Sequence, residues 1–289
     1  MSWLPPIRPL KTQNKIPRGP RDITPCDSRE QQASRKPPTC PRLKTQKQAE
    51  PKLILDLGCG PGNGTALLRA RWPQARILGI DGSASMIARA QEENKDPKVS
   101  YRQQTIEDWL AETEGTEPDQ RPNLIVSNAV FHWIENHLDL LPRITQALAP
   151  GGSLAFQVAG NFLAPTHALL RELAADPRFA PHIQTKLIDS VTPAADYIQA
   201  LAGEGWQVDA WETTYQHILQ GQDPVYEWLA GAGARPVLTA LPADLREEFS
   251  TRYRTALRQA YPASPVGTIL PFRRIFTVAT QEASRALAA

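Results

Sequence analysis

The feature that most constrains the fold of this chain is the stretch Leu53–Asn63, with the sequence LILDLGCGPGN. Its apolar run is followed by glycines at every second position, Gly58, Gly60 and Gly62. An apolar run that ends in glycines is typical of a buried parallel strand that turns sharply toward a helix. Glycine opens backbone angles closed to other residues and lets a ligand approach the main chain. Because helix-compatible sequence follows over residues 64–71, the stretch predicts a strand, a glycine turn and a helix start that together form a cradle for a nucleotide-like ligand.

The glycine spacing separates two kinds of cradle. It reads G-x-G-x-G here, whereas dinucleotide folds use G-x-G-x-x-G, in which the third glycine serves helix packing beneath a pyrophosphate. Asp56 also precedes the glycines, and a carboxylate there favours a cationic ligand over a diphosphate. A tight turn without any ligand is the alternative for a glycine motif alone. The combination resembles motif I of the class I S-adenosylmethionine-dependent methyltransferases. The resemblance implies that the turn binds the methionine part of this cofactor through Asp56, Gly58, Cys59, Gly60 and Gly62.

Charge and cysteine content exclude several classes of protein. The chain has 32 Lys and Arg against 30 Asp and Glu, but residues 1–50 hold 11 basic and 4 acidic residues and the remainder holds 21 and 26. The part after residue 50 therefore lacks the broad basic face of a nucleic-acid-binding protein. Three cysteines without metal-ligand spacing indicate no metal site and a reducing, cytoplasmic location. We expect no membrane partner, since no run of 18 apolar residues exists.

Residues 1–50 differ from everything that follows. They contain nine prolines and almost no apolar periodicity, so we expect a disordered, basic domain. A tail for anionic partners and a transit peptide are alternatives. In the resembled family, an aromatic-rich helix precedes the first strand and closes over the cofactor. Only the first three residues, MSW, match that helix, so a shifted reading frame is a third interpretation, and the lid over the cofactor is then missing.

From residue 51 onward, strand and helix patterns alternate, which predicts an α/β fold with a mostly parallel sheet. We expect helices at 63–71, from about 83, at 136–148 and at 165–173, and seven strands at 52–57, 76–81, 99–103, 123–128, 153–159, 207–215 and 272–279. The resemblance implies the Rossmann-like sheet of class I methyltransferases, with a cofactor-binding core at 51–160 and the rest of the sheet at 161–289. Helical inserts at about 161–200 and 220–266 then cover the acceptor. The second insert carries an amphipathic helix with apolar residues four apart, Leu245, Phe249, Tyr253 and Leu257.

Acidic and polar residues at strand ends supply further cofactor contacts. Asp81 lies 19 residues past Gly62 at the end of a strand, close to the spacing at which an acidic residue meets a ribose diol. The alternative role for Asp81 is capping of the next helix. For Met86 the two alternatives are packing on adenine and packing in the core. Where the resembled family has an acidic residue for the adenine amino group, this chain has Thr105, with Ile106 beside it. The resemblance adds two residues at the end of the fourth strand, Asn128 and Ala129.

Motifs spread over residues 51–289 narrow the resemblance further. The segments LGCGPGN, GIDGS, NAVFHW, PTH, TTY and GARP together resemble the trans-aconitate 2-methyltransferases, which form a monomethyl ester of trans-aconitate. A carboxylate is ionised at neutral pH and needs no general base, and arginine matches carboxylates in bidentate geometry. We therefore expect His132 to orient neighbours, although a general base is its alternative role. The residues predicted to bind a small polycarboxylate substrate are His132, Trp133, Arg171, Tyr215, Arg235 and Arg273.

Three functions remain compatible with the sequence. Methylation of trans-aconitate is the leading one, and methylation of another carboxylate such as a malonyl thioester is the second. A degenerate methyltransferase-like binding protein is the third, favoured only where residues 1–50 are a genuine segment and the lid over the cofactor is lost. The sequence leaves the oligomeric state open.

Overall fold

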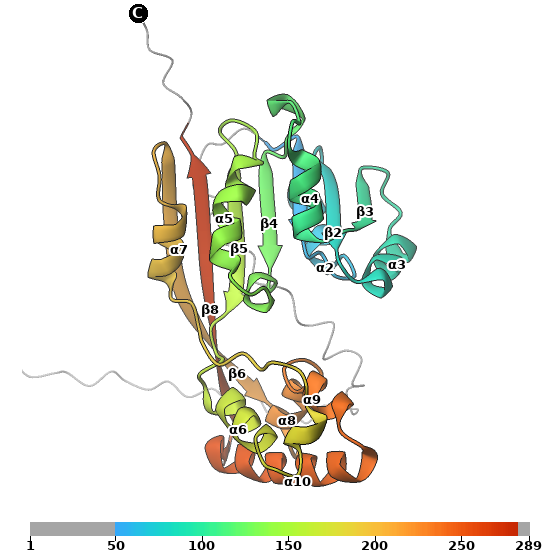
Figure 1. The fold of residues 1–289 in the computed structure, drawn as a ribbon, viewed down its shortest axis with the longest axis vertical. Coiled ribbons are helices and arrows are strands. Elements are labelled where there is room, and N and C mark those ends of the chain that lie inside the picture. The colour runs from blue at the N-terminus through green and yellow to red at the C-terminus, as the bar shows by residue number, and fades with distance from the viewer. Residues whose placement is uncertain (1–49, 283–289) are drawn as a thin grey trace, which may run out of the picture. The chain divides into compact units, whose positions relative to one another are not determined.

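A computed structural model describes residues 50–282 of the chain. Its central sheet follows the strand order β3-β2-β1-β4-β5-β8-β6, and the short strand β7 pairs with β8 (Figure 1). The strands are β1 (Leu53–Leu57), β2 (Arg76–Asp81), β3 (Val99–Gln103), β4 (Leu124–Asn128), β5 (Ser153–Ala159), β6 (Trp206–Leu219), β7 (Ala263–Ser264) and β8 (Gly267–Gln281). The expectations of disorder and of a shifted reading frame for residues 1–50 concern a segment that, apart from residue 50, lies outside the described residues.

Parallel pairing joins β3, β2, β1, β4 and β5, whereas β8 runs antiparallel to both β5 and β6. The strand order reverses beside β1, because β2 and β3 follow on one side of it and β4 and β5 on the other. In open α/β sheets, ligands bind at the carboxyl ends of the strands at such a reversal. The predicted α/β class and the mostly parallel seven-stranded sheet are confirmed, with β7 as one two-residue addition.

Helices cover both faces of this sheet. On one face, α4 (Ile106–Thr113), α5 (His137–Gln146) and α7 (Ala194–Leu201) contribute to the largest hydrophobic cluster. On the opposite face, α2 (Asn63–Arg71) packs through Leu68 in a separate cluster with Ile54 and Ile77. Helix α3 (Ala84–Glu93) lies along β2 and β3. The parallel strands are thus buried from both sides, which is why their sequences are nearly continuous apolar runs.

The antiparallel ribbon of β6 and β8 is longer than the sequence suggested. We expected strands at 207–215 and 272–279, but pairing continues in register to Leu219 and Thr268. Along β6 the side chains from Trp211 to Leu219 alternate between partly buried and exposed. This period-2 pattern indicates that the ribbon has one covered face over its whole length. The extension carries the sheet into a group of helices that the ribbon joins to the parallel strands (Figure 1).

These helices form the helical insert: α6 (Pro165–Ala174), α8 (Pro224–Ala230), α9 (Arg235–Ala240) and α10 (Ala243–Ala260). They have their own hydrophobic cluster, in which Phe249, Tyr253 and Leu257 of α10 are almost fully buried. The amphipathic helix predicted from these positions is confirmed. Helix α7 falls inside the expected 161–200 insert but packs against α5 and β6 instead. The division of the chain at residue 160 stays a prediction.

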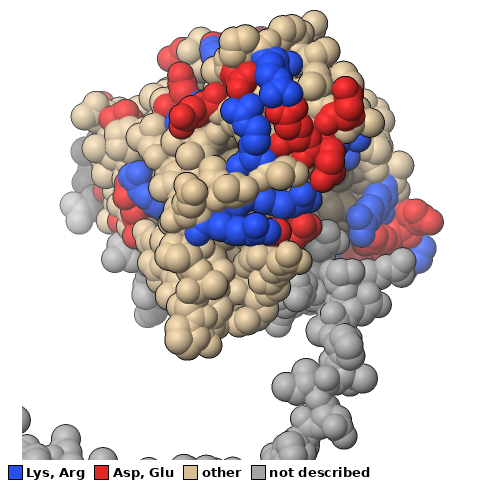
Figure 2. Space-filling model, turned by 90° about the horizontal axis from the view of Figure 1, so that it is seen from below, with Lys and Arg blue, Asp and Glu red and all other residues tan. Residues whose placement is uncertain are grey.

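The surface of the helical insert carries charges of both signs in close alternation (Figure 2). Several of them are ion pairs within the insert or its connecting loops, Arg252 with Asp176, Arg178 with Glu248 and Arg258 with Asp223. Exposed pairs of this kind contribute at most about 1 kcal/mol each. The insert is therefore held mainly by its apolar cluster.

Candidate active site

The glycine turn between β1 and α2 has the backbone geometry that its sequence predicts. Gly58, Gly60 and Gly62 have φ angles of 68°, 55° and 89°, all in the left-handed region. A Cβ atom at Gly58 would lie 2.2 Å from the Cγ2 atom of Val130, so no side chain fits there. At Gly60, by contrast, no atom lies within 4 Å of such a Cβ. Packing therefore dictates glycine at Gly58, whereas the space beside Gly60 is open to a ligand.

Asp81 ties the turn to the end of β2. Its two carboxylate oxygens accept hydrogen bonds from the backbone N–H groups of Gly60, at 3.0 Å, and Ser83, at 2.8 Å. Ser83 is itself the N-cap of α3, so Asp81 precedes the cap and does not take the helix-capping role that was its alternative. Each carboxylate oxygen has a second lone pair, and the side chain is only partly buried. Asp81 can therefore hold the turn and still accept hydrogen bonds from a ribose diol.

Asp56 lies beneath the turn, with only 4% of the residue exposed. Its Oδ2 atom accepts a hydrogen bond of 2.6 Å from the Thr65 hydroxyl. Burial raises the pKa of Asp56 to about 6, although the Thr65 bond opposes the shift. Burial and the two nearby carboxylates, Asp56 and Asp81, raise the pKa of Cys59 to about 12, so this thiol is neutral at physiological pH. The structure thus joins Asp56 to α2, and its contact with the cofactor stays a prediction.

The end of β4 carries a strained residue beside the turn. Ala129 has a φ angle of 61°, which is uncommon for a residue other than glycine. Such backbone strain persists only where the surrounding structure imposes it, and it gathers at functional sites. Ala129 donates its backbone N–H to Gln157 on β5, at 2.8 Å, and the preceding Asn128 is exposed. Because β4 pairs with β1, this strand end and the glycine turn form one edge of the sheet.

The residues expected around adenine have two different environments. Met86 is 38% exposed at the start of α3, where a thioether is available to an aromatic ligand. Thr105 is the N-cap of α4, because its hydroxyl oxygen accepts from the backbone N–H of Asp108 at 3.1 Å. Ile106 is buried. The Thr105 hydroxyl is thus already engaged in capping, and its role toward adenine stays a prediction.

Aromatic rings cover the carboxyl edge beyond β4. His132 and Trp133 lie on the short helix η3 (Phe131–Trp133), and the His132 ring centroid is 4.9 Å from that of Trp133 and 5.3 Å from that of Phe162. Trp133 is 58% exposed. Burial, assisted by the nearby His137 and His167, lowers the pKa of His132 to about 3. This imidazole is therefore neutral at physiological pH and is a weak base, which agrees with an orienting role.

The three arginines expected to bind the acceptor are in different situations. Arg171 on α6 donates from Nη1 to the carbonyl oxygens of Phe162, at 2.7 Å, and Ile188, at 2.9 Å, and so links two loops. Arg273 on β8 forms a bidentate ion pair with Glu212, with N–O distances of 2.6 and 2.8 Å. Arg235 is exposed at the start of α9. Among these three arginines, only the Arg235 side chain forms no hydrogen bond or ion pair with the described residues. The binding roles of all three stay predictions.

Sequence reasoning missed a group of polar residues at the end of β5 and on β8. Gln157 is 5% exposed, yet its Nε2 atom has no hydrogen-bond partner. Arg274, adjacent to the predicted Arg273, donates from Nη1 to the Oε1 atom of Gln157 at 2.9 Å. Tyr215, a predicted substrate residue, lies on β6 with its ring centroid 5.9 Å from the Arg274 guanidinium carbon. The available signal was a glutamine within the apolar run of β5, since a polar residue in a buried strand needs a partner.

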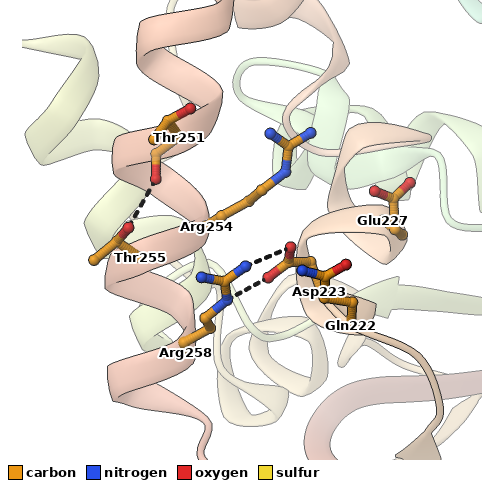
Figure 3. A pocket seen from close by; sticks show the side chains of 7 residues that line it. All are labelled: Gln222, Asp223, Glu227, Thr251, Arg254, Thr255 and Arg258. Atoms are coloured by element: carbon orange, nitrogen blue, oxygen red, sulfur yellow. Dashed lines mark hydrogen bonds and ion pairs between the residues drawn. The ribbon is translucent and has the colours of Figure 1, made fainter.

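The structure also has a hollow of about 500 Å³ within the helical insert (Figure 3). It lies between α8 and α10, and Arg258 and Asp223 in its wall form two hydrogen bonds of 2.7 and 2.8 Å to each other. Arg254 lies over the ring of Tyr226, 4.2 Å from its centroid. The cations of this hollow thus have partners in the protein, and none of its lining residues belongs to a strand end. We therefore place the active site at the carboxyl edge of the sheet.

The residues at this edge fit S-adenosylmethionine. Open space at Gly60, a partly buried Asp81 carboxylate and an exposed Met86 match a ligand with a methionine part, a ribose diol and an adenine ring. A separate hollow of about 700 Å³ lies between α2, the end of α3 and the loop before β3, and its lining includes Pro61 and Gly62 but neither Asp81 nor Met86. Within residues 50–282, no group of three or more His, Cys, Asp or Glu side chains is arranged to hold a metal ion.

Comparison with known proteins decides the family. A family model described as "Methyltransferase domain" matches residues 29–210. The trans-aconitate 2-methyltransferase of Streptomyces avermitilis is 48% identical over 241 residues, covering 81% of this chain and 87% of that protein. The chain belongs to the trans-aconitate 2-methyltransferase family. The enzymes of the same name from Streptomyces coelicolor and Methylobacterium nodulans are 45% and 42% identical, cover 80% of this chain in both cases, and are themselves covered to 77% and 87%.

Membership in this family confirms the predicted enzyme class and the predicted cofactor: the protein is an S-adenosylmethionine-dependent methyltransferase. For the prediction that it has no membrane partner, the structure gives information on membrane-spanning helices only. None of the helices within the described part of the chain has the length and apolar character needed to cross a bilayer.

Proposed function

We propose that this enzyme transfers the methyl group of S-adenosylmethionine to a carboxylate of trans-aconitate and forms the monomethyl ester. The observation that carries the proposal is the 48% identity to a protein named trans-aconitate 2-methyltransferase over 81% of the chain. A small polycarboxylate is therefore the proposed substrate, and a reducing, cytoplasmic location belongs to the same proposal. Methylation of another carboxylate, such as a malonyl thioester, is the second candidate.

The geometry at the carboxyl edge supports a carboxylate acceptor. The histidine beside the proposed acceptor site, His132, is held neutral by burial, with a pKa of about 3. An alcohol or an ammonium acceptor must lose a proton before it attacks, and so needs a general base. A carboxylate is ionised above its ordinary pKa of about 4 and needs none. The edge therefore offers neighbours that orient the acceptor rather than a residue that activates it.

The chain's own residues act by binding, orienting and excluding water. When bound, the cofactor supplies a methyl group on a positively charged sulfur, which makes that methyl electrophilic. We assign the glycine turn and Asp81 to holding the cofactor, with Asn128 and Ala129 beside them. The rings of Trp133 and Phe162 exclude water from the acceptor side, because water solvates the carboxylate and weakens its attack. Fixing the two reactants at a productive distance contributes several kcal/mol.

The test is a methyl-transfer assay on the full chain with labelled S-adenosylmethionine. We expect kcat/KM for trans-aconitate to exceed that for cis-aconitate, citrate and malonyl thioesters by at least about tenfold, since a site built for one pattern of carboxylates leaves groups unpaired with another. A higher kcat/KM for any other acceptor replaces trans-aconitate as the substrate. Calorimetry with S-adenosylmethionine completes the test, because cofactor binding without transfer to any acceptor identifies a degenerate binding protein.

A further inference from the structure

Two adjacent arginines on β8 lie on opposite faces of the sheet. Arg273 points toward Glu212 and forms the bidentate ion pair described above, with N–O distances of 2.6 and 2.8 Å. Arg274 pairs in register with Thr213 on β6 and Ala159 at the carboxyl end of β5. Among residues 50–282, no Asp or Glu forms an ion pair with Arg274. The second arginine is therefore a cation without an anionic partner in the described part of the chain.

The surroundings of Arg274 are apolar on one side. Its guanidinium carbon lies 5.0 Å from the ring centroid of Phe272 and 5.9 Å from that of Tyr215. Rings at these distances attract a cation and restrict its rotation. The residue is partly buried, and burial lowers the pKa of Arg274 from its ordinary value. Since arginine remains protonated in proteins, this site holds a partly dehydrated positive charge, a state that an anion stabilises.

A second donor lies beside the guanidinium. Arg274 Nη1 donates to Gln157 Oε1 at 2.9 Å, and because a guanidinium only donates, the amide atom facing it must be the oxygen. The Gln157 amide is thereby oriented with its Nε2 group elsewhere, buried and without a partner. Buried N–H groups without partners are rare in native proteins and cost about 1–3 kcal/mol. The Arg274 guanidinium, which is only partly buried, uses one N–H group for Gln157 and keeps the others for a ligand that carries acceptor atoms.

The strands that carry Gln157 and Arg274 lie beside the strands that carry the predicted cofactor residues. Gln157 on β5 pairs with Asn128 on β4, and β4 in turn pairs with β1, which leads into the glycine turn. Parallel strands in register present paired residues on the same face of the sheet. Gln157 therefore lies one strand beyond the predicted cofactor residue Asn128 and Arg274 two strands beyond it, all on the same face of the sheet.

We propose that Arg274, oriented by Gln157 and by the rings of Tyr215 and Phe272, binds a non-reacting carboxylate of the acceptor. This inference rests on the proposed function, since it assumes an acceptor with more than one carboxylate. A guanidinium donates two parallel hydrogen bonds to a carboxylate, in bidentate geometry. Arg274 then determines specificity: an acceptor with a single carboxylate leaves its charge unpaired.

The experiment compares four variants of the full chain with the wild type: Arg274→Gln, Arg274→Lys, Arg273→Gln and Arg102→Gln. Arg102 forms an exposed ion pair with Glu112 and serves as the control for loss of a surface charge. Kinetics give KM for trans-aconitate and for S-adenosylmethionine. Calorimetry gives the affinity for trans-aconitate of protein saturated with S-adenosylhomocysteine. Thermal unfolding checks that every variant is folded.

We expect Arg274→Gln to raise KM for trans-aconitate about 10- to 100-fold, the effect of losing hydrogen bonds to a charged group. KM for S-adenosylmethionine changes less than about twofold, because the cofactor makes no ion pair with Arg274 in this proposal. Arg274→Lys keeps the charge without the fork and restores part of the affinity. Arg273→Gln raises the acceptor KM far less than Arg274→Gln, and Arg102→Gln leaves it unchanged.

Other outcomes overturn the inference separately from the proposed function. If the wild type methylates trans-aconitate and folded Arg274→Gln keeps its acceptor KM within about threefold, Arg274 does not bind the acceptor. If Arg273→Gln instead raises the acceptor KM by the amount expected for Arg274→Gln, the carboxylate-binding role belongs to Arg273. If the wild type prefers cis-aconitate, citrate or a malonyl thioester, the choice of trans-aconitate fails, and the same variants measured with the preferred acceptor decide the role of Arg274. If no carboxylate binds the wild type in calorimetry, both proposals are wrong.

Discussion

The two halves of the proposed active site are built from different parts of the polypeptide. On the proposed cofactor side, between β1, β2 and β4, the backbone gives the site its shape, because three glycines and Ala129 have positive φ angles and Asp81 accepts hydrogen bonds from main-chain N–H groups. On the proposed acceptor side, between η3, β5 and β8, side chains give the site its shape, through tilted ring contacts and the Arg274–Gln157 hydrogen bond. A backbone shape is restricted to the few residues that can adopt it, whereas a cluster of side chains can be assembled from many sequences. The difference explains why only the first half has a short sequence motif.

Replacing glycines in the turn should give the largest loss of stability, and the turn belongs to the cofactor half. We expect Gly58→Ala to lower the free energy of unfolding by about 3 kcal/mol, because alanine in the left-handed region costs about 1–2 kcal/mol and its Cβ overlaps Val130. At Gly60 the φ angle is 55° but the space around an added Cβ is open. We therefore expect Gly60→Ala to lower the free energy of unfolding by only about 1 kcal/mol. Urea unfolding of both variants measures the difference.

The same pair of variants tests where the ligand lies. A methyl group at Gly60 occupies space that the protein leaves open, so Gly60→Ala should weaken binding of S-adenosylhomocysteine in calorimetry although the variant is folded. Equal loss of stability in the two variants would contradict the packing argument at Gly58. Unchanged ligand affinity in Gly60→Ala would remove that position from the cofactor site.

Asp56 provides a pH-dependent test of the same half. Its pKa in the folded chain is about 6, against an ordinary value of 3.8. A raised pKa means that the folded state favours the neutral acid, so this contribution to stability is present below about pH 4 and is lost as the pH rises through 6. Asparagine cannot ionise, yet its carbonyl oxygen still accepts the Thr65 hydroxyl. We expect Asp56→Asn to gain on the order of 2 kcal/mol relative to wild type between about pH 4 and pH 7.

Urea unfolding at several pH values gives this difference directly, because contributions from the other titrating groups are common to both proteins. The exposed residue Asp119 supplies the matched control. Asp119→Asn removes a surface carboxylate and should not reproduce the gain in stability expected for Asp56→Asn. A difference for Asp56→Asn that does not change with pH would show that Asp56 titrates normally in the folded chain.

Arg235 should give the smallest effect and tests how far the acceptor half extends. It is exposed at the start of α9, where solvent and salt screen its charge. We expect Arg235→Ala to raise KM for trans-aconitate only about two- to fivefold, because an exposed ion pair with the acceptor contributes little. KM for S-adenosylmethionine should rise by less than that. Raising the ionic strength should remove the difference from wild type. An effect as large as that of Arg274→Gln would place Arg235 inside the site.

Much of the fold was predictable from the sequence because local signals were strong. The apolar run before Gly58 located β1, and an acidic residue after an apolar run located the end of β2 at Asp81. The spacing of Phe249, Tyr253 and Leu257 identified α10 before any contact was known. What the sequence did not show was the length of the β6–β8 ribbon, because its outer residues are covered by helices that come from elsewhere in the chain. Burial by distant segments leaves only weak local patterns.

The acceptor residues were harder to predict for a related reason. Arg273 and Arg274 are adjacent and chemically identical, and only the register of β8 decides that one faces Glu212 and the other Gln157. Arg171 had the right chemistry and the right region, yet it bonds to carbonyl oxygens of two loops. A sequence gives the type of each cation but not its partner. An ion pair that spans 61 residues, as between Glu212 and Arg273, is a property of the folded sheet.

The long ribbon has a consequence for how such an enzyme can diversify. Because β6 and β8 pass without interruption from the sheet into the helical insert, these two strands join the insert to the sheet three and four strands away from β1. Substitutions among its helices leave the hydrogen bonds of the glycine turn unchanged. The insert can then diversify in sequence while the glycine turn keeps its geometry, and of the predicted acceptor residues only Arg171 and Arg235 lie on its helices.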